Sequence, residues 1–199
     1  MIQNEIDRYR KASYDIDREF IERWSPRSFQ EKEIPEALLF SLFEAAHWAP
    51  SAMNLQPWRF ILARSEEDRK RFYSFVFDSN RAWCEKAPVL AIIVSKKTND
   101  KGRDNRTHAF DTGAAWGFLT LQAYKKGLIV HGMGGFDKEA ARKVLSIPKT
   151  YEIHAVAAIG YQDEKEKLPE KYQEREFPSE RKPLKEIVFE GTWPKTNKD

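Results

Sequence analysis

Apolar residues recur along the chain with two spacings, one typical of amphipathic helices and one typical of buried strands. The helical spacing is clearest over residues 107–126, which end in two lysines and the C-cap candidate Gly127. The same spacing predicts one or two N-terminal helices, with Ser13 as a cap where the pattern restarts. Further helices are predicted over residues 35–50, 66–77 and 138–147.

Nearly continuous apolar runs lie between these predicted helices. The runs are WRFILA (58–63), PVLAIIVS (88–95), LIV (128–130) and EIHAVAAIGY (152–161). A run without polar interruption is typical of a strand that is covered on both faces. We therefore expect an α+β fold with one layer of sheet and helices on both sides of it.

The length of 199 residues fits one domain, which we expect to span residues 1–199. Within it, residues 1–14 form a helical N-terminal extension, and residues 162–199 form a charge-rich tail of the kind that wraps over a surface. A hydrophobic content of 41% with 33% charged residues is typical of a globular chain rather than a disordered one.

The charge distribution, the length of the apolar runs, and the few cysteines and histidines argue against several classes of function. The net charge of +3 comes from 34 basic and 31 acidic side chains that are interspersed, so we expect no nucleic-acid partner. No apolar run is long enough to cross a membrane or to direct secretion, which predicts a cytoplasmic protein without a membrane partner. Cys84 has no second cysteine, and the four histidines are scattered, so we expect neither a disulfide nor a bound metal.

The segment RWSPRSF (23–29) is the first candidate site. Arg23, Ser25 and Arg27 stand at alternate positions, and Pro26 favours extended backbone before it, so the three side chains are expected on one side. Two guanidinium groups and a hydroxyl suit a phosphate monoester. Taken alone, the segment fits a solvated surface stretch at least as well.

A glycine loop and a polar joint are two further candidates. HGMGG (131–135) lets a ligand approach the backbone closely, although an ordinary turn explains it equally well, and it does not match a dinucleotide-binding G-x-G-x-x-G. In WAPSAMNLQPWRF (48–60), Ser51 and Asn54 offer a hydroxyl and an amide, with local turns as the alternative. No acid, base or nucleophile is evident, which favours chemistry carried by an organic cofactor.

Taken together, these motifs resemble the FMN-dependent nitroreductase family. They are R-x-S-x-R-x-F (23–29), A-P-S-x-x-N-x-Q-P-W-x-F (49–60), DTGAAWGFLTLQAYKKGL (111–128), the Gly134–Gly135 pair and AIGY (158–161). The resemblance covers about residues 15 to 188. It implies a nitroreductase-like fold, a central mixed sheet flanked by helices, and an intertwined homodimer whose tail (162–199) wraps the partner subunit.

The resemblance also implies a tightly bound FMN and no catalytic side chain. Arg23, Ser25, Arg27 and the tail's Arg181 would hold its phosphate and ribityl chain, residues 50–54 would reach the flavin of the other subunit, and a backbone amide at 134–135 would meet the flavin's reactive nitrogen. Asn80 and Arg81 both fall near a position that contacts the ring. The full implied set is Arg23, Trp24, Ser25, Arg27, Pro50, Ser51, Ala52, Asn54, Met133, Gly134, Gly135 and Arg181.

The implied activity is a ping-pong NAD(P)H oxidoreductase, in which NADH or NADPH binds transiently and a nitroaromatic, quinone or similar small molecule accepts the electrons. The short connection KKTNDKGRDN (96–105) predicts an open cleft without the lid that relatives use to dehalogenate tyrosines. Two alternatives stay open. One is a specialised flavin-dependent oxidase, dehydrogenase or flavin-cleaving enzyme without steady NAD(P)H turnover, and the other is a non-catalytic flavin-binding protein.

Overall fold

A four-stranded sheet forms the centre of the molecule. The computed structural model describes residues 2–194, with side chains from Ile6 onward, so residues 195–199 of the predicted tail lie outside it. The strands are β1 (Trp58–Ala63), β2 (Val89–Lys96), β3 (Ile129–Met133) and β4 (Tyr151–Gly160), in the spatial order β1-β2-β4-β3. All three pairings are antiparallel, so the expectation of a mixed sheet is wrong for the single chain.

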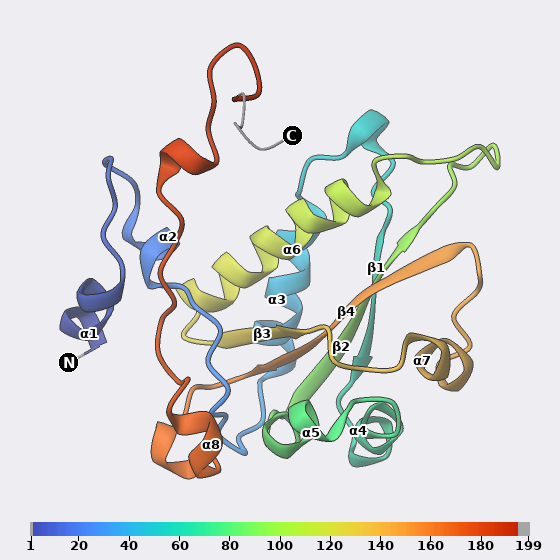
Figure 1. The fold of residues 1–199 in the computed structure, drawn as a ribbon. Helices are drawn as coiled ribbons and strands as arrows, with labels where there is room; N and C mark the ends of the chain where they lie inside the picture. The colour runs from blue at the N-terminus through green and yellow to red at the C-terminus, as the bar shows by residue number, and fades with distance from the viewer. Residues whose placement is uncertain (1, 195–199) are drawn as a thin grey trace.

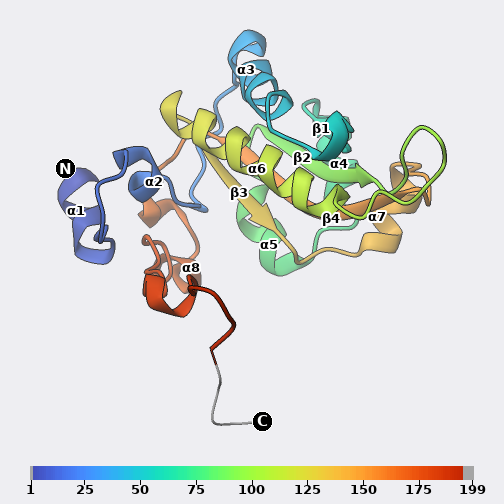
Figure 2. The same ribbon diagram turned by 90° about the horizontal axis from the view of Figure 1, so that it is seen from above.

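Helices cover both faces of the sheet (Figures 1 and 2). One face is covered by α3 (Glu36–His47) and α6 (His108–Lys125), and the other by α4 (Glu66–Tyr73), α5 (Asp78–Cys84) and α7 (Lys138–Val144). Each face has its own apolar core, because successive strand residues point to opposite sides. Ile93 and Leu119 belong to the first core, and Ile92 and Phe72 to the second. The predicted α+β class and single sheet layer are confirmed.

The remaining elements belong to the two ends of the chain and to one loop. α1 (Ile2–Tyr9) and α2 (Arg18–Glu22) form the N-terminal arm, and η1 (Ala52–Asn54) lies in the polar joint before β1. The tail contains η2 (Lys165–Lys167), α8 (Glu170–Gln173) and η3 (Leu184–Glu186), and its end projects away from the layered body in both views (Figures 1 and 2).

Two helix predictions need correction. α2 begins at Arg18 after Asp17, so Ser13 caps no helix. The helix predicted over 66–77 ends early, because α4 stops at Tyr73 and Val76 pairs with Phe136 in an isolated antiparallel bridge, and α5, which starts at Asp78, was not predicted. That long-range bridge brings the start of α5 next to the glycine loop.

Candidate functional site

The segment 23–29 is fixed as extended backbone between α2 and the ends of β3 and β4. The ring Nδ1 of His131 on β3 lies 3.0 Å from the carbonyl oxygen of Pro26. Ser28 donates its hydroxyl to the Glu164 carbonyl at 2.6 Å, and Phe29 forms a bridge with Gln162. These contacts hold the candidate phosphate-binding residues against the edge of the sheet.

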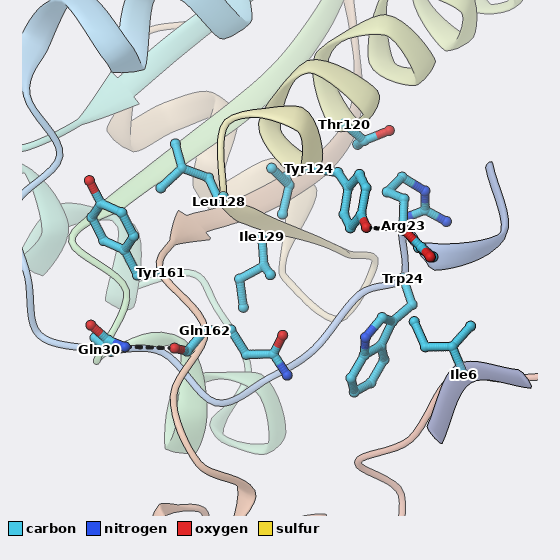
Figure 3. A pocket seen from close by; sticks show the side chains of 13 residues that line it. Ile6, Arg23, Trp24, Gln30, Thr120, Tyr124, Leu128, Ile129, Tyr161 and Gln162 are labelled. Atoms are coloured by element: carbon cyan, nitrogen blue, oxygen red, sulfur yellow. Dashed lines mark hydrogen bonds between the residues drawn. The ribbon is translucent and has the colours of Figure 1, made fainter. Parts of the chain in front are cut away.

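Arg23 and the tail's Arg181 come close together, as the family resemblance implies, because Arg10 donates to the backbone carbonyls of Arg23 at 2.8 Å and of Ser179 at 2.9 Å. Burial, and next the positive charge of Arg181, lower the pKa of Arg23. Arg181 donates to the Ser179 hydroxyl at 3.0 Å. Arg23 and Trp24 line a cavity of about 690 Å³ beside the last turns of α6 and the start of β3 (Figure 3). Arg23 lines this cavity and Arg181 does not, and the second guanidinium group near Arg23 favours an anion beside it.

Arg27 has different surroundings from Arg23. Its Nη1 lies 3.5 Å from the buried carboxylate of Glu176, and the backbone N–H groups of Arg27 and Ser28 donate to the other oxygen of Glu176 at 2.6 and 3.0 Å. The charge of Arg27 is therefore already balanced within the chain. This ion pair ties the tail to the segment 23–29.

The glycine loop follows β3 and leaves its backbone accessible. Met133 is buried at the end of the strand, whereas a Cβ added to Gly134 would meet nothing within 4 Å. The carbonyl of Gly135 accepts from the Phe77 backbone N–H and from Asn80 Nδ2, both at 3.1 Å. Arg81 instead pairs with Glu85. The family resemblance leaves open whether Asn80 or Arg81 lies at the flavin ring. Of these two, only Asn80 hydrogen-bonds to the glycine loop in the described structure.

A second cavity, of about 510 Å³, contains Ser25, Met133 and Gly134 together with residues of α6 and β4. Thr112 of α6 lines it, and the buried Thr112 hydroxyl has no hydrogen-bond partner in the described part of the chain. His154 of β4 also lines it. Cavity walls that combine a glycine loop with polar groups and an unpaired hydroxyl suit a ligand with polar atoms.

His154 belongs to a buried polar group that the sequence pattern does not reveal. The hydroxyl of Ser95 on β2 lies 2.6 Å from both His154 Nε2 and His108 Nδ1. The Ser95 hydroxyl can donate its one proton to only one of these two ring nitrogens, so it accepts a hydrogen bond from the other. Burial, and next the charge of His108, lower the pKa of His154.

The polar joint has a strained backbone. Met53, Asn54 and Gln56 adopt positive φ angles of 52°, 54° and 44°. The Ser51 hydroxyl accepts from the Gln56 N–H at 3.0 Å, and the Ala52 N–H donates to Asp111 of α6 at 3.3 Å. Non-glycine residues in this region cost about 1–3 kcal/mol each and cluster at functional sites. The joint is therefore a candidate ligand loop.

A single chain does not bring the joint and the other candidates into one cavity. The joint contacts the first turn of α6 through Asp111, whereas Arg23 shares its cavity with Tyr124 in the last turn. The helix axis advances about 20 Å between those two residues. Met53 and Asn54 line a third cavity, next to β1, which is the sheet edge opposite β3.

Within residues 2–194, no cluster of three or more histidines, cysteines or carboxylates has the arrangement to hold a metal ion. No helix in this range has the length and hydropathy to span a membrane. The cytoplasmic location expected from the sequence stays a prediction.

Known proteins match this chain over the segments that contain these candidate sites. A family model described as the nitroreductase family matches residues 21–83 and 76–161. An NADH dehydrogenase of Thermus thermophilus is 28% identical over 85% of this chain and 92% of its own length. An iodotyrosine deiodinase of Thermotoga neapolitana is 27% identical over 80% and 94%. A crystal structure described as an oxidoreductase containing FMN is 40% identical, covers 94% of this chain and 97% of its own, and superposes with a TM-score of 0.90.

Proposed function

The chain belongs to the nitroreductase family, and from that premise we propose that it is an FMN-dependent oxidoreductase that transfers electrons from NADH or NADPH to nitroaromatic, quinone or similar acceptors. The relatives described as an FMN-containing oxidoreductase and as an NADH dehydrogenase support this assignment. Arg23 lies near one end of β3 with Arg181 close to it, and the open glycine loop follows the other end of the same strand. This placement is the observation that carries the proposal.

This arrangement fits FMN. Arg23 and Arg181 would bind the phosphate, because guanidinium groups donate forked hydrogen bonds to its oxygens. The Ser25 hydroxyl, in the second cavity, would meet the ribityl chain, and the Thr112 hydroxyl gains a partner there. The backbone N–H groups at Gly134 and Gly135 would donate to the flavin ring, with Asn80 holding the loop in place.

The side chains at this site bind and orient, and bound FMN supplies the hydride and single-electron chemistry that they lack. Gly134 leaves space on the open side of the loop for a flat second substrate. The connection from β2 to α6 is a tight hairpin with a bridge between Thr98 and Asp104, so no helical lid covers the cleft from that segment. We therefore propose that reductant and acceptor occupy one open cleft in turn, with broad acceptor choice.

We further propose that the site is completed by a second copy of the chain. Phe110 is 82% exposed on α6, and Cβ atoms added to Gly113 or Gly117 would meet nothing within 4 Å in the described structure. An apolar helix face with small residues suits close packing of a second helix. Two antiparallel copies of α6 would place the joint of one chain (50–54) beside the phosphate-binding residues of the other, and the exposed apolar tail residues 187–189 would wrap the partner.

Steady-state kinetics test the activity. The purified protein is assayed with NADH and with NADPH against a panel of a nitroaromatic, a quinone and free flavin. We expect reductant oxidation that depends on the acceptor and gives parallel double-reciprocal lines, as a ping-pong mechanism requires. Bound FMN without turnover would favour the specialised relative or the flavin-binding protein. The Arg23→Ala variant should fold like the wild type but lose activity unless excess FMN is supplied.

A further inference from the structure

Three arginines from distant parts of the sequence gather at one place beside α2. They are Arg10 of the N-terminal extension, Arg23 directly after α2, and Arg181 of the tail. Burial, and next the charges of Arg181 and Arg23, lower the pKa of Arg10 to about 10. The geometry agrees, because the Arg10 side chain donates to the backbone carbonyl of Arg23 and to that of Ser179, two residues before Arg181.

No carboxylate among residues 6–194 forms an ion pair with this cluster. Among the side chains of residues 6–194, none of the three arginines forms an ion pair, whereas nearby cations do: Arg18 pairs with Asp7 and Glu22 at 3.0 Å, and Lys125 pairs with Glu19 at 2.6 Å. Acidic side chains are thus available next to the cluster and are used by other residues. Arg10 and Arg23 are partly buried and Arg181 is exposed, and three guanidinium groups without a paired carboxylate at one place favour an anion from outside the chain.

Arg10 is held in a defined position by three backbone carbonyls. Its Nη1 donates to the carbonyls of Ile21 at 2.7 Å and Arg23 at 2.8 Å, and its Nε donates to the carbonyl of Ser179 at 2.9 Å. The side chain thereby connects the extension, the segment that carries Arg23 and the segment that carries Arg181. Two N–H donors remain on Nη2, because a guanidinium has five.

Other contacts fix the extension independently of Arg10. Tyr9 stacks on Phe177 of the tail with ring centroids 5.1 Å apart, and Asp7 pairs with Arg18. Loss of the Arg10 side chain should therefore leave the extension docked and remove only the link between Arg23 and Arg181.

We propose that Arg10 is a positioning residue that holds Arg23 and Arg181 together as a binding site for the FMN phosphate, so that the N-terminal extension makes the protein select phosphorylated flavin over riboflavin. This inference rests on the proposed function. It assigns to residues 1–14 a role that lies outside the shared sequence motifs.

The dissociation constants of FMN and riboflavin test the proposal. Flavin is removed from the purified full-length protein, and each ligand is titrated by quenching of flavin fluorescence. Wild-type protein should prefer FMN. Arg10→Ala should weaken FMN binding tenfold or more and leave riboflavin binding unchanged, so the preference collapses. Arg10→Lys keeps the charge but loses the planar fork, and should fall between the two. Arg8→Ala, an exposed arginine of the same extension, is the matched control and should resemble the wild type.

The unchanged riboflavin affinity separates positioning of the phosphate site from general damage to the fold, which would weaken both ligands equally. If Arg10→Ala and Arg10→Lys both kept the wild-type preference for FMN, this inference alone would be overturned. It would also be overturned if the variants lost affinity for FMN and riboflavin equally. Wild-type protein that binds neither flavin would overturn the proposed function and this inference with it.

Discussion

Arg23 and Arg27 stand four positions apart in the same motif, yet their surroundings give them different roles. Arg23 has no ion-pair partner among the described side chains, whereas Arg27 neutralises the buried Glu176. We therefore expect Arg23→Ala to remove charge-assisted hydrogen bonds worth about 1.5–3 kcal/mol to the FMN phosphate. That loss corresponds to roughly 10- to 150-fold in affinity. Arg27→Ala should instead lower the free energy of unfolding by about 1–3 kcal/mol, because Glu176 loses its cation.

Flavin titration and urea denaturation of both variants check this contrast. Arg64→Ala, which removes an exposed arginine paired with Glu36, is the matched control and should change neither quantity measurably. Adding Glu176→Gln to Arg27→Ala should recover part of the lost stability, since the buried charge is removed. Equal loss of FMN affinity in the two single variants would contradict the distinction between Arg23 and Arg27.

His131 and His154 should make stability depend on pH below neutrality. Burial lowers the pKa of both rings below 6.5, assisted by Arg27 at His131 and by His108 and Lys138 at His154, while Glu152 opposes the shift at His154. Below pH 6.5 the unfolded chain then binds more protons than the folded one, so the free energy of unfolding falls with falling pH. The slope is at most about 1.4 kcal/mol per pH unit for each ring.

Urea denaturation at several pH values between about 5.5 and 7.5 measures this slope. His154→Asn should make it shallower, and His131→Asn should do the same. A slope that equals that of the wild type in both variants would show that neither ring contributes to the pH dependence.

At the scale of elements, two glycines at the ends of neighbouring strands have opposite roles. A Cβ on Gly160, at the end of β4, would stand 2.8 Å from ring atoms of Phe29 and Pro88, which have little room to move. Gly160→Ala should therefore reduce the free energy of unfolding by about 1–3 kcal/mol. Gly134→Ala meets open space and should leave stability unchanged while weakening FMN binding.

Thermal and urea unfolding of the two glycine variants, followed by flavin titration, test this assignment. We expect Gly160→Ala to lose stability but not FMN affinity, and Gly134→Ala to lose FMN affinity but not stability. If Gly134→Ala bound FMN as tightly as the wild type, the open face of the loop would not be part of the cofactor site.

Long periodic elements and contiguous motifs could be predicted from the sequence. The helix predicted over 107–126 is α6 to within one residue at each end, and the strands at 58–63 and 152–161 are β1 and β4 to within one residue. α5 was not predicted, and the early end of α4 was missed because it depends on the bridge from Val76 to Phe136, sixty residues away. Apolar spacing carries no information on such a contact.

The site residues likewise divide into those that the sequence predicts and those that only the structure reveals. Arg23 was predicted from its motif and Arg181 from the family resemblance, and Arg10 links the backbones of the two segments that carry them. Arg10 escaped notice because its partners are backbone carbonyls, which any sequence supplies. The pairing of Arg27 with Glu176 joins residues 149 positions apart, and the Ser95 contact of His154 depends on strand register. Only the assembled fold reveals these neighbours.

For the whole molecule, the proposed dimer would bring the joint of one subunit to the phosphate-binding residues of the other, so we expect cofactor binding to depend on a second subunit. Phe118 is 43% exposed on the outward face of α6. Phe118→Glu should place a charge in the interface between the two copies of α6, convert the dimer to a monomer, and release flavin.

Light scattering combined with the visible spectrum tests this dependence on dimerisation. Val144→Glu on α7 removes an apolar side chain with 42% exposure on a different surface, and should remain dimeric and yellow. A Phe118→Glu monomer that retains a full complement of FMN would contradict the shared site.

The most direct test of the account is the visible spectrum of the protein, purified without added flavin, during titration with NADH or NADPH in the absence of oxygen. We expect a yellow protein that contains about one FMN per chain and bleaches when either nucleotide is added. A yellow protein that neither nucleotide bleaches would contradict the proposed oxidoreductase while keeping the flavin site. A colourless protein that does not take up FMN would contradict the account as a whole.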